Sequence, residues 1–185
     1  MLNQDQNLVK QLVSRESIYQ GKGVELWLDE LLMPNGNKLK KEHLHHPHCV
    51  AVLAIDDDNR CALVRQYRYA IEKVILEVPA GKIDKGGESP LEAAVRELKE
   101  ETGYTADEWI SLGIMYPTPG VVDEVLHLYL ARGLHRGEQE LEEYEFIQVE
   151  WVPLCELERH IAEMKINDGK TICTLARAKM MDYVK

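Results

Sequence analysis

Three glutamates, Glu97, Glu100 and Glu101, lie within five residues near the C-terminal end of a predicted helix. Side chains three and four positions apart share one side of a helix, where like charges repel by about 0.2–0.5 kcal/mol per pair. The helix dipole also disfavours negative charge at that end. Clustered carboxylate oxygens are the ligands that a hard divalent cation such as Mg²⁺ prefers, so the spacing predicts a metal site. A solvated acidic helix face is the alternative that the spacing leaves open.

The helix that carries these glutamates can be bounded from its two ends. Ser89, with Glu92 three residues later, forms a capping box, and Pro90 stands at the first helical position, where its missing N–H costs nothing. Gly103 suits the left-handed residue that ends a helix. These residues predict a helix over residues 90–102. Its expected buried stripe, on a different face from the glutamates, is Leu91, Ala94, Val95 and Leu98.

Most of the remaining chain shows strand patterns. Alternation over residues 24–33, followed by a strong turn signal, predicts a hairpin that returns over residues 38–46. Further strands are expected near residues 49–55, 62–69, 75–79, 109–115, 124–131 and 146–152, and helices near 154–165 and 170–183. This order is typical of an α/β (α+β) sandwich with a mixed sheet, and not of a repeating βαβ fold. We expect a small N-terminal β subdomain over residues 1–46 and a main domain over residues 47–185.

The overall charge limits the classes of partner. The 185-residue chain carries a net charge of −10, with a pI near 5.2. Nucleic acids and anionic membranes favour basic surfaces, so we expect neither as a partner. The N-terminus lacks a secretory pattern, and no stretch approaches the roughly 18 apolar residues that a membrane-spanning helix needs. Four scattered cysteines without a paired motif are typical of a reduced, cytoplasmic protein.

The stretch from residue 81 to residue 104 resembles the Nudix box, the signature of hydrolases that cleave nucleoside diphosphates linked to another moiety. Glu88 is followed by seven residues and then by RELKEETG over residues 96–103, which matches the signature position by position. Two positions depart from it. Six residues instead of five separate Gly81 from Glu88, and Tyr104 replaces an aliphatic residue. The resemblance implies a Nudix α/β/α sandwich with a mixed β-sheet and a small N-terminal β-sheet subdomain.

Within that family the chain is similar to ADP-ribose pyrophosphatases, through its segments RQYR, VPAG, TPG and EYEFIQV. This resemblance implies a role for several residues. The implied metal ligands are Ala80 (through its carbonyl), Glu97, Glu100 and Glu101. The implied catalytic residues are Arg96, Glu97, Glu101 and Glu145, the last of which assists the attacking water. The implied substrate-binding residues are Arg68 (on the diphosphate), Glu42, Pro119, Gly120 and Glu124. Glu142 and Glu143 remain alternatives to Glu145 as the base.

The activity implied by the resemblance is Mg²⁺-dependent hydrolysis of the pyrophosphate bond of ADP-ribose or a related nucleoside diphosphate sugar. Mn²⁺ is an alternative ion, and the products are a nucleoside monophosphate and a sugar phosphate. GDP-mannose or another nucleoside diphosphate sugar is the alternative substrate. An alternative of a different class is a nucleotide-sugar-binding regulator without catalysis. The intact glutamates argue against a regulator, because a sensor has no need of three mutually repelling charges.

Two further features of the N-terminal segment bear on assembly and on metal binding. A small sheet is barely stable alone, and relatives of the ADP-ribose type are dimers, so a homodimer would bury Trp27, Leu31 and Met33. Folding of the segment back onto its own main domain is the alternative.

The cluster His43, His45, His46 and His48 would offer ligands for a transition metal, although histidines at a strand end are more often surface residues or line an interface.

Overall fold

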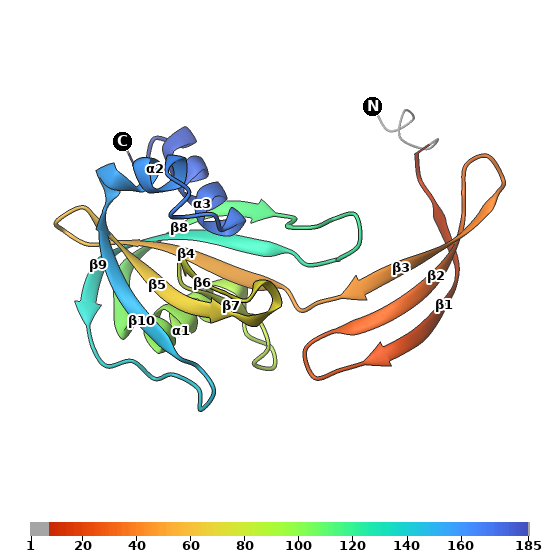
Figure 1. Ribbon diagram of the computed structural model, residues 1–185, viewed down its shortest axis with the longest axis horizontal. Helices are drawn as coiled ribbons and strands as arrows, with labels where there is room; N and C mark the ends of the chain where they lie inside the picture. The colour runs from red at the N-terminus through yellow and green to blue at the C-terminus, as the bar shows by residue number, and fades with distance from the viewer. Residues whose placement is uncertain (1–7, 185) are drawn as a thin grey trace. The chain divides into compact units, whose positions relative to one another are not determined.

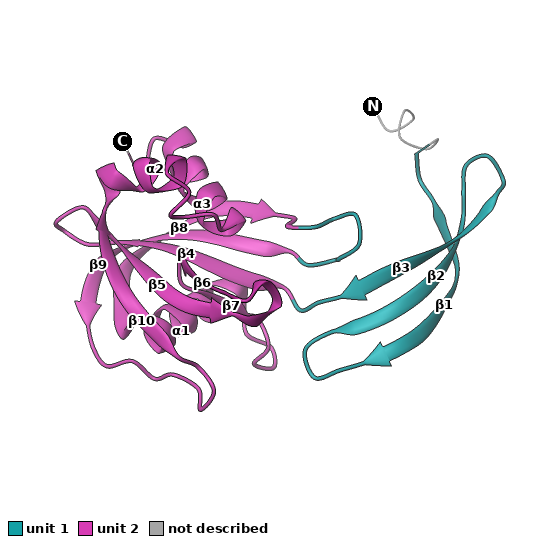
Figure 2. Cartoon of the chain, viewed as in Figure 1, with its two compact units in different colours: residues 1–47, 118–124 teal, residues 48–117, 125–185 magenta. Residues whose placement is uncertain are grey.

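The computed structural model describes residues 8–184. The chain divides into two compact units (Figure 2). Unit 1 comprises residues 1–47 and 118–124, and unit 2 comprises residues 48–117 and 125–185. Residues 1–7 of the expected N-terminal subdomain lie outside the described part. Within the described part, no helix has both the length and the apolar character needed to cross a membrane.

Unit 1 is built on a three-stranded antiparallel sheet in the order β1-β2-β3 (Figure 1). Its strands are β1 (Gln11–Gln20), β2 (Glu25–Leu32) and β3 (Lys38–His45). In the turn between β2 and β3, Gly36 has a φ of 83°, which glycine adopts without steric strain. The predicted hairpin is confirmed, and β1 is an addition to it. Leu44 N donates a hydrogen bond to Val121 O at 2.8 Å, which joins residues 118–124 to β3.

Unit 2 contains a seven-stranded mixed sheet (Figure 1). Its strands are β4 (Cys49–Ile55), β5 (Arg60–Arg68), β6 (Lys73–Glu77), β7 (Ala80–Lys82), β8 (Tyr104–Met115), β9 (Leu126–Arg136) and β10 (Ile147–Pro153). The main order is β10-β5-β4-β9-β8, with β6 paired to β5 and β7 paired to β4. The pair β4–β9 is parallel and the others are antiparallel. The sheet is therefore mixed, as the sequence predicts.

Helices cover both faces of this sheet, which makes unit 2 an α/β/α sandwich (Figure 1). The helices are α1 (Pro90–Thr102), α2 (Leu154–Ala162) and α3 (Gly169–Met180), with a short 3₁₀ turn η1 (Tyr69–Ile71) after β5. Every residue of β4 is buried. Val50, Val52 and Ala54 pack with residues of α1. The alternate residues, such as Leu53, pack with residues of α2 and α3. A strand buried on both sides is expected at the centre of such a sandwich.

Helix α1 begins and ends where its sequence predicts. Ser89 Oγ accepts a hydrogen bond from Glu92 N at 3.3 Å, and Glu92 Oε2 accepts one from Ser89 N at 2.7 Å. At the other end, Gly103 adopts a left-handed φ of 77°. Both ends depend on contacts between residues close together in the chain, so the local sequence was sufficient to place them.

The predicted buried stripe of α1 is wrong in part. Leu91 and Val95 are 41% and 38% exposed, whereas Glu97 and Glu101 are buried beside Leu98. The helix is rotated about its axis, so that two of its carboxylates face the protein interior. The physical reason lies in strand β7, because Ala80 N donates a hydrogen bond to Glu101 and the backbone of Gly81 leaves room for the Glu97 carboxylate.

Candidate active site

On one side, strand β4 pairs with two different strands along its length, and the candidate site lies next to the second of them, β7. Ala54 and Ile55 pair with β5, whereas residues 49–51 pair with β7. The segment that joins β6 to β7 is tied to two other elements, α3 and β4. Val78 N donates to Thr171 Oγ1 of α3 at 2.9 Å, and Pro79 O accepts from Val52 N of β4 at 2.9 Å. These bonds hold the chain in place just before Ala80.

Ala80 and Gly81 bring the backbone of β7 against two glutamates of α1. Ala80 N donates to Glu101 Oε2 at 2.9 Å. A Cβ atom added at Gly81 would lie 2.0 Å from Glu97 Cδ, so any side chain there would displace the Glu97 carboxylate. The close approach survives the extra residue before Glu88. Gly87, with a φ of 82° in that loop, adopts a conformation that suits glycine.

Glu97 and Glu101 are carboxylates that the protein keeps away from water. They are 8% and 3% exposed. Burial raises the pKa of Glu97 to about 7, although Arg96 opposes the change. Burial, together with the charges of Glu97 and Glu145, raises the pKa of Glu101 to about 8. Two buried carboxylates short of positive charge, beside the backbone of Ala80, form a donor set that fits a hard divalent cation.

Arg96 holds the outer side of this carboxylate group. Its Nη1 donates to Glu97 Oε1 at 2.7 Å and to Glu100 Oε2 at 2.9 Å. Its Nη2 donates to Lys82 O at 2.8 Å and to Glu88 Oε1 at 2.9 Å. The hydrogen bond from Arg96 also lowers the pKa of Glu88. Arg96 is fully engaged with the protein, so its contacts are those of a residue that orients glutamates.

The loop over residues 137–146 lies along the C-terminal turn of α1. Gln139 Nε2 donates to Glu101 O at 2.6 Å, and Glu140 N donates to Glu100 O at 3.1 Å. These bonds satisfy carbonyls that have no partner within the helix. A Cβ atom added at Gly103 would lie 2.9 Å from Gln139 N, so glycine is also needed for this contact.

Three glutamates of the loop were candidates for the base, and their surroundings differ. The charge of Glu145 raises the pKa of both Glu97 and Glu101, so Glu145 lies within electrostatic reach of them. Glu142 instead pairs with Lys85 Nζ at 3.6 Å. Glu142 N donates to Glu145 Oε2 at 3.1 Å. Glu143 is exposed and has no hydrogen bond or ion pair among the described residues.

Comparison with known proteins identifies the fold and family of this arrangement. The NUDIX domain family matches residues 45–175. A "Methanol dehydrogenase activator" of Bacillus methanolicus is 39% identical over 175 residues, which cover 94% of each chain. An "ADP-ribose pyrophosphatase" of Bacillus subtilis (strain 168) is 39% identical over 167 residues, which cover 89% of this chain and 90% of the relative. The chain belongs to the Nudix family.

The family assignment confirms the resemblance seen in the sequence, and the chain is a Nudix pyrophosphohydrolase. A solved structure, "Crystal structure of ADP compounds hydrolase", matches it with a TM-score of 0.83. The match is 24% identical in sequence and covers 93% of each chain. At that identity the match bears on the fold alone, and it confirms the predicted Nudix sandwich.

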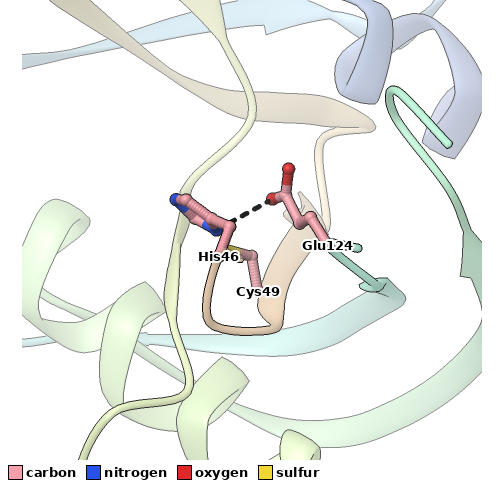
Figure 3. Close-up of side chains that lie close together, drawn as sticks. All are labelled: His46, Cys49 and Glu124. Carbon is pink, nitrogen blue, oxygen red and sulfur yellow. Dashed lines mark ion pairs between the residues drawn. The ribbon is translucent and has the colours of Figure 1, made fainter. Parts of the chain in front are cut away.

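Unit 1 of this Nudix protein contains the other residues that the resemblance assigns to substrate. Glu42, Pro119 and Gly120 line a pocket of about 260 Å³ that is formed within unit 1. Glu124 lies outside the residues that line this pocket, and its Oε1 lies 4.0 Å from His46 Nδ1 (Figure 3). Arg68, in contrast, belongs to unit 2, where it ends β5 and donates from Nε to Glu77 Oε1 at 2.7 Å.

The histidine cluster contributes to charge pairing within unit 1. His43 lies 3.1 Å from Asp29 Oδ2 and 3.2 Å from Asp123 Oδ2, and His45 Nδ1 lies 2.7 Å from Asp123 Oδ2. The His45 ring also stacks on Trp27, with 4.8 Å between the ring centroids. His43 and His45 therefore lie against carboxylates of their own unit.

The sequence did not predict two further buried carboxylates, Asp29 and Glu77. Asp29 is 5% exposed in β2, and Glu77 has no exposed surface at the end of β6. The sequence contains a signal for Glu77, because a charge follows the apolar residues Ile75 and Leu76 in a predicted strand. Such a charge is rarely buried without a partner. The partners of both residues come from distant segments and leave no local pattern.

Proposed function

We propose that this protein hydrolyses the pyrophosphate bond of ADP-ribose or a related nucleoside diphosphate sugar, with Mg²⁺ as its ion and Mn²⁺ as a substitute, in the cytoplasm. The observation that carries this proposal is the pair of buried carboxylates, Glu97 and Glu101, packed against the backbone of Ala80 and Gly81. The relative from Bacillus subtilis, named an ADP-ribose pyrophosphatase, supports the choice of substrate.

The residues that would hold the ion are Glu97, Glu100, Glu101 and the carbonyl of Ala80. When bound, a divalent cation offsets the negative charge of a diphosphate and lowers the pKa of a coordinated water. Arg96 keeps Glu97 and Glu100 in a fixed orientation through its two short hydrogen bonds. The raised pKa of Glu101 reflects a cost of charge burial that a cation would relieve.

The proposed reaction is attack of a water oxygen on one phosphorus of the pyrophosphate. A new O–P bond forms, and the bridging O–P bond breaks to release a nucleoside monophosphate and a sugar phosphate. Glu145 accepts the proton of the water, a role supported by its electrostatic reach to Glu97 and Glu101. Arg68 donates hydrogen bonds to the phosphate oxygens, which are acceptors that a guanidinium suits well.

We also assign Glu42, Pro119, Gly120 and Glu124 to substrate binding. The pocket of unit 1 supports this assignment for the first three residues, since a cavity near 260 Å³ is large enough for part of a nucleotide sugar. Lys41 lines the same pocket. The pocket therefore combines a carboxylate for hydroxyl groups with an ammonium for phosphate oxygens.

We further propose that the protein is a homodimer in which unit 1 meets the partner chain. Among the described residues of unit 1, Asp29 is the only buried one, so its sheet has no apolar core of its own. Every residue of β1 is exposed, including Leu12, Ile18 and Tyr19, which are 52%, 52% and 60% exposed. An edge strand with exposed apolar side chains needs a covering partner.

Activity is tested with purified protein, Mg²⁺ and a panel that contains ADP-ribose, GDP-mannose and other nucleotide sugars, by measuring the released phosphomonoesters. Fastest turnover of ADP-ribose is the expected result. Faster turnover of GDP-mannose would make GDP-mannose the preferred substrate, and binding without any turnover would favour a regulator.

The dimer is tested by light scattering, which is expected to give twice the chain mass of 21.2 kDa. A monomer mass with full activity would contradict the dimer.

A further inference from the structure

Glu77, at the end of β6, is a buried carboxylate at the centre of a group of charges outside the carboxylate pair of α1. Its Oε1 accepts the hydrogen bond from Arg68 Nε at 2.7 Å, and its Oε2 pairs with Lys170 of α3. Lys170 also pairs with Asp168 Oδ1 at 3.1 Å. A carboxylate without exposed surface needs both charge and hydrogen bonds to offset its lost hydration. Two cations from different elements supply them here.

Arg68 is held along one edge only. Among the described residues, the bond from its Nε–H to Glu77 is the one hydrogen bond that its side chain makes to the protein. Four further N–H donors of the guanidinium, on Nη1 and Nη2, lie on its other edges. The side chain is 39% exposed, so these donors are open to a ligand. A planar guanidinium anchored at one edge presents the remaining edges in a fixed direction, which suits bidentate contact with phosphate oxygens.

The electrostatic coupling places this anchor within reach of the candidate active site. Burial lowers the pKa of Arg68, but the hydrogen bond and charge of Glu77, with the charge of Glu101, raise it overall. The charge of Glu77 also contributes to the raised pKa of Glu101, which is due first to burial. The charge of Glu101, a candidate metal ligand, therefore acts on Arg68 together with the charge of Glu77.

We propose that Glu77 is a positioning residue, which holds Arg68 by its Nε edge while Lys170 balances the second carboxylate oxygen, so that the free guanidinium edge meets the substrate diphosphate. This inference rests on the proposed function, and it adds a residue to which neither the sequence motif nor the family comparison assigned a role. Glu77 acts through Arg68 and makes no contact with substrate.

A double-mutant cycle tests whether Glu77 acts through Arg68. Glu77→Gln keeps the side-chain shape and one acceptor oxygen but removes the charge. We expect it to raise the KM for ADP-ribose about tenfold, with a smaller change in kcat, because ground-state contact with the diphosphate is loosened. In an Arg68→Ala background the same change should alter kcat/KM less than about twofold. An equal loss in both backgrounds would overturn the proposal.

The competing explanation is that Glu77 acts through the backbone, since Val78 follows it directly and Ala80 lies three residues later. The Mg²⁺ concentration that gives half-maximal activity separates the two explanations. It should stay within about twofold in Glu77→Gln, and a larger shift would assign the effect to Ala80 and overturn the proposal. Glu150→Gln is the matched control, because Glu150 pairs with Arg65 of the same strand β5, at 3.1 Å, but on the surface. It should leave KM unchanged.

Glu77→Gln leaves Lys170 with Asp168 as its remaining ion-pair partner among the described residues, and the loss of the Glu77 charge could prevent folding. If Glu77→Gln does not fold, the variant with both Glu77→Gln and Lys170→Met, which removes both charges together, replaces it in the double-mutant cycle with Arg68→Ala. The expected result is the same rise in KM and the same absence of effect in the Arg68→Ala background. A normal KM in this variant would overturn the proposal.

A measurement without substrate separates this inference from the proposed function. In the NMR spectrum, the Arg68 Nε–H signal, assigned by its loss in Arg68→Ala, should exchange slowly with water in the wild type and rapidly in Glu77→Gln. Rapid exchange in the wild type would overturn the anchoring of Arg68. Slow exchange in a protein that hydrolyses no nucleoside diphosphate sugar would support the anchoring and overturn the proposed function instead.

Discussion

Asp29 in unit 1 and Glu101 in unit 2 are both carboxylates with almost no exposed surface, 5% and 3%. Arg15 donates Nε and Nη2 to the two oxygens of Asp29 at 2.7 and 2.8 Å. These hydrogen bonds lower the pKa of Asp29. Glu101 accepts a hydrogen bond from the backbone N–H of Ala80 but pairs with no cation among the described residues, and burial raises its pKa to about 8. Burial acts to raise the pKa of both groups, but the hydrogen bonds from Arg15 outweigh it at Asp29.

This difference is the one that we expect between a structural carboxylate and a functional one. In unit 1 the buried charge of Asp29 pairs with Arg15, so it is offset without a ligand. Unit 2 leaves Glu97 and Glu101 short of positive charge, although Arg96 donates a hydrogen bond to Glu97. Proteins retain such local conflicts mainly at functional sites. The comparison predicts that neutralising a carboxylate harms folding in unit 1 and harms catalysis in unit 2.

The largest effect is expected for Glu101→Gln. Turnover should fall on the order of 10³-fold, because a lost metal ligand removes several kcal/mol of transition-state stabilisation. The midpoint of thermal unfolding without metal should stay level or rise, since a buried charge is removed. Assays with saturating Mg²⁺ and calorimetry of the metal-free protein measure the two effects. Near-normal Mg²⁺-dependent turnover would refute the role of Glu101 as a ligand.

The second effect concerns the base within unit 2. Glu145→Gln should lower turnover on the order of 10²-fold, because general base catalysis is lost, while the Mg²⁺ dependence changes little. Glu142→Gln and Glu143→Gln are the matched controls and should each cost less. Stopped assays at saturating substrate compare the three variants. If Glu143→Gln is the most impaired, the role of base moves to Glu143.

A smaller effect, on stability alone, is expected in unit 1. Asp29→Asn should lower the free energy of unfolding by about 1–3 kcal/mol, because hydrogen bonds to a charged partner are lost. Glu30→Gln is the control, since Glu30 pairs with Lys38 on the surface at 3.1 Å, and should cost less than about 1 kcal/mol. Denaturant unfolding measures both. Equal costs would mean that the burial of Asp29 adds nothing to its pairing.

The smallest effect is a pH dependence carried by Asp123. Partial burial opposes ionisation, but the hydrogen bonds from His45, His46 N and His43 lower the pKa of Asp123 from 3.8 to about 2. A lowered pKa adds stability that is fully present above pH 3.8 and is lost as the pH falls toward 2. Asp123→Asn should therefore reduce unfolding stability at pH 6 more than at pH 2. A constant difference between those values would contradict this assignment.

The sequence was most informative where structure depends on neighbours in the chain. The ends of α1 follow from Ser89 and Gly103, and the β2–β3 hairpin follows from its turn. The rotation of α1 could not be predicted from its local sequence. The burial of Glu97 and Glu101 depends on Ala80 and Gly81, which belong to strand β7. Apolar periodicity favoured Leu91 and Val95, and the contacts of the carboxylates outweighed it.

The candidate site was predictable as far as its motif extends. Glu97, Glu100 and Glu101 could be named because their spacing is local and their charges conflict. Asp29 and its partner Arg15 are 14 positions apart, and Glu77 and Lys170 are 93 positions apart. Pairings at such separations leave no periodic trace in a single sequence. Strand β1 was missed as a separate element because its polar residues obscure the alternation.

Unit 1 includes a segment from the middle of the chain, and this has a consequence for the order of folding during synthesis. The hairpins of residues 11–45 can form as soon as they leave the ribosome. The pairing of His45 with Asp123 spans 78 positions, so it cannot form before the loop at residues 118–124 has emerged. Until then, Asp29 has Arg15 and His43 beside it, but the histidines have no Asp123. The charge pairing of the unit 1 sheet therefore waits for residues 118–124, although the strands of that sheet precede this loop in the chain.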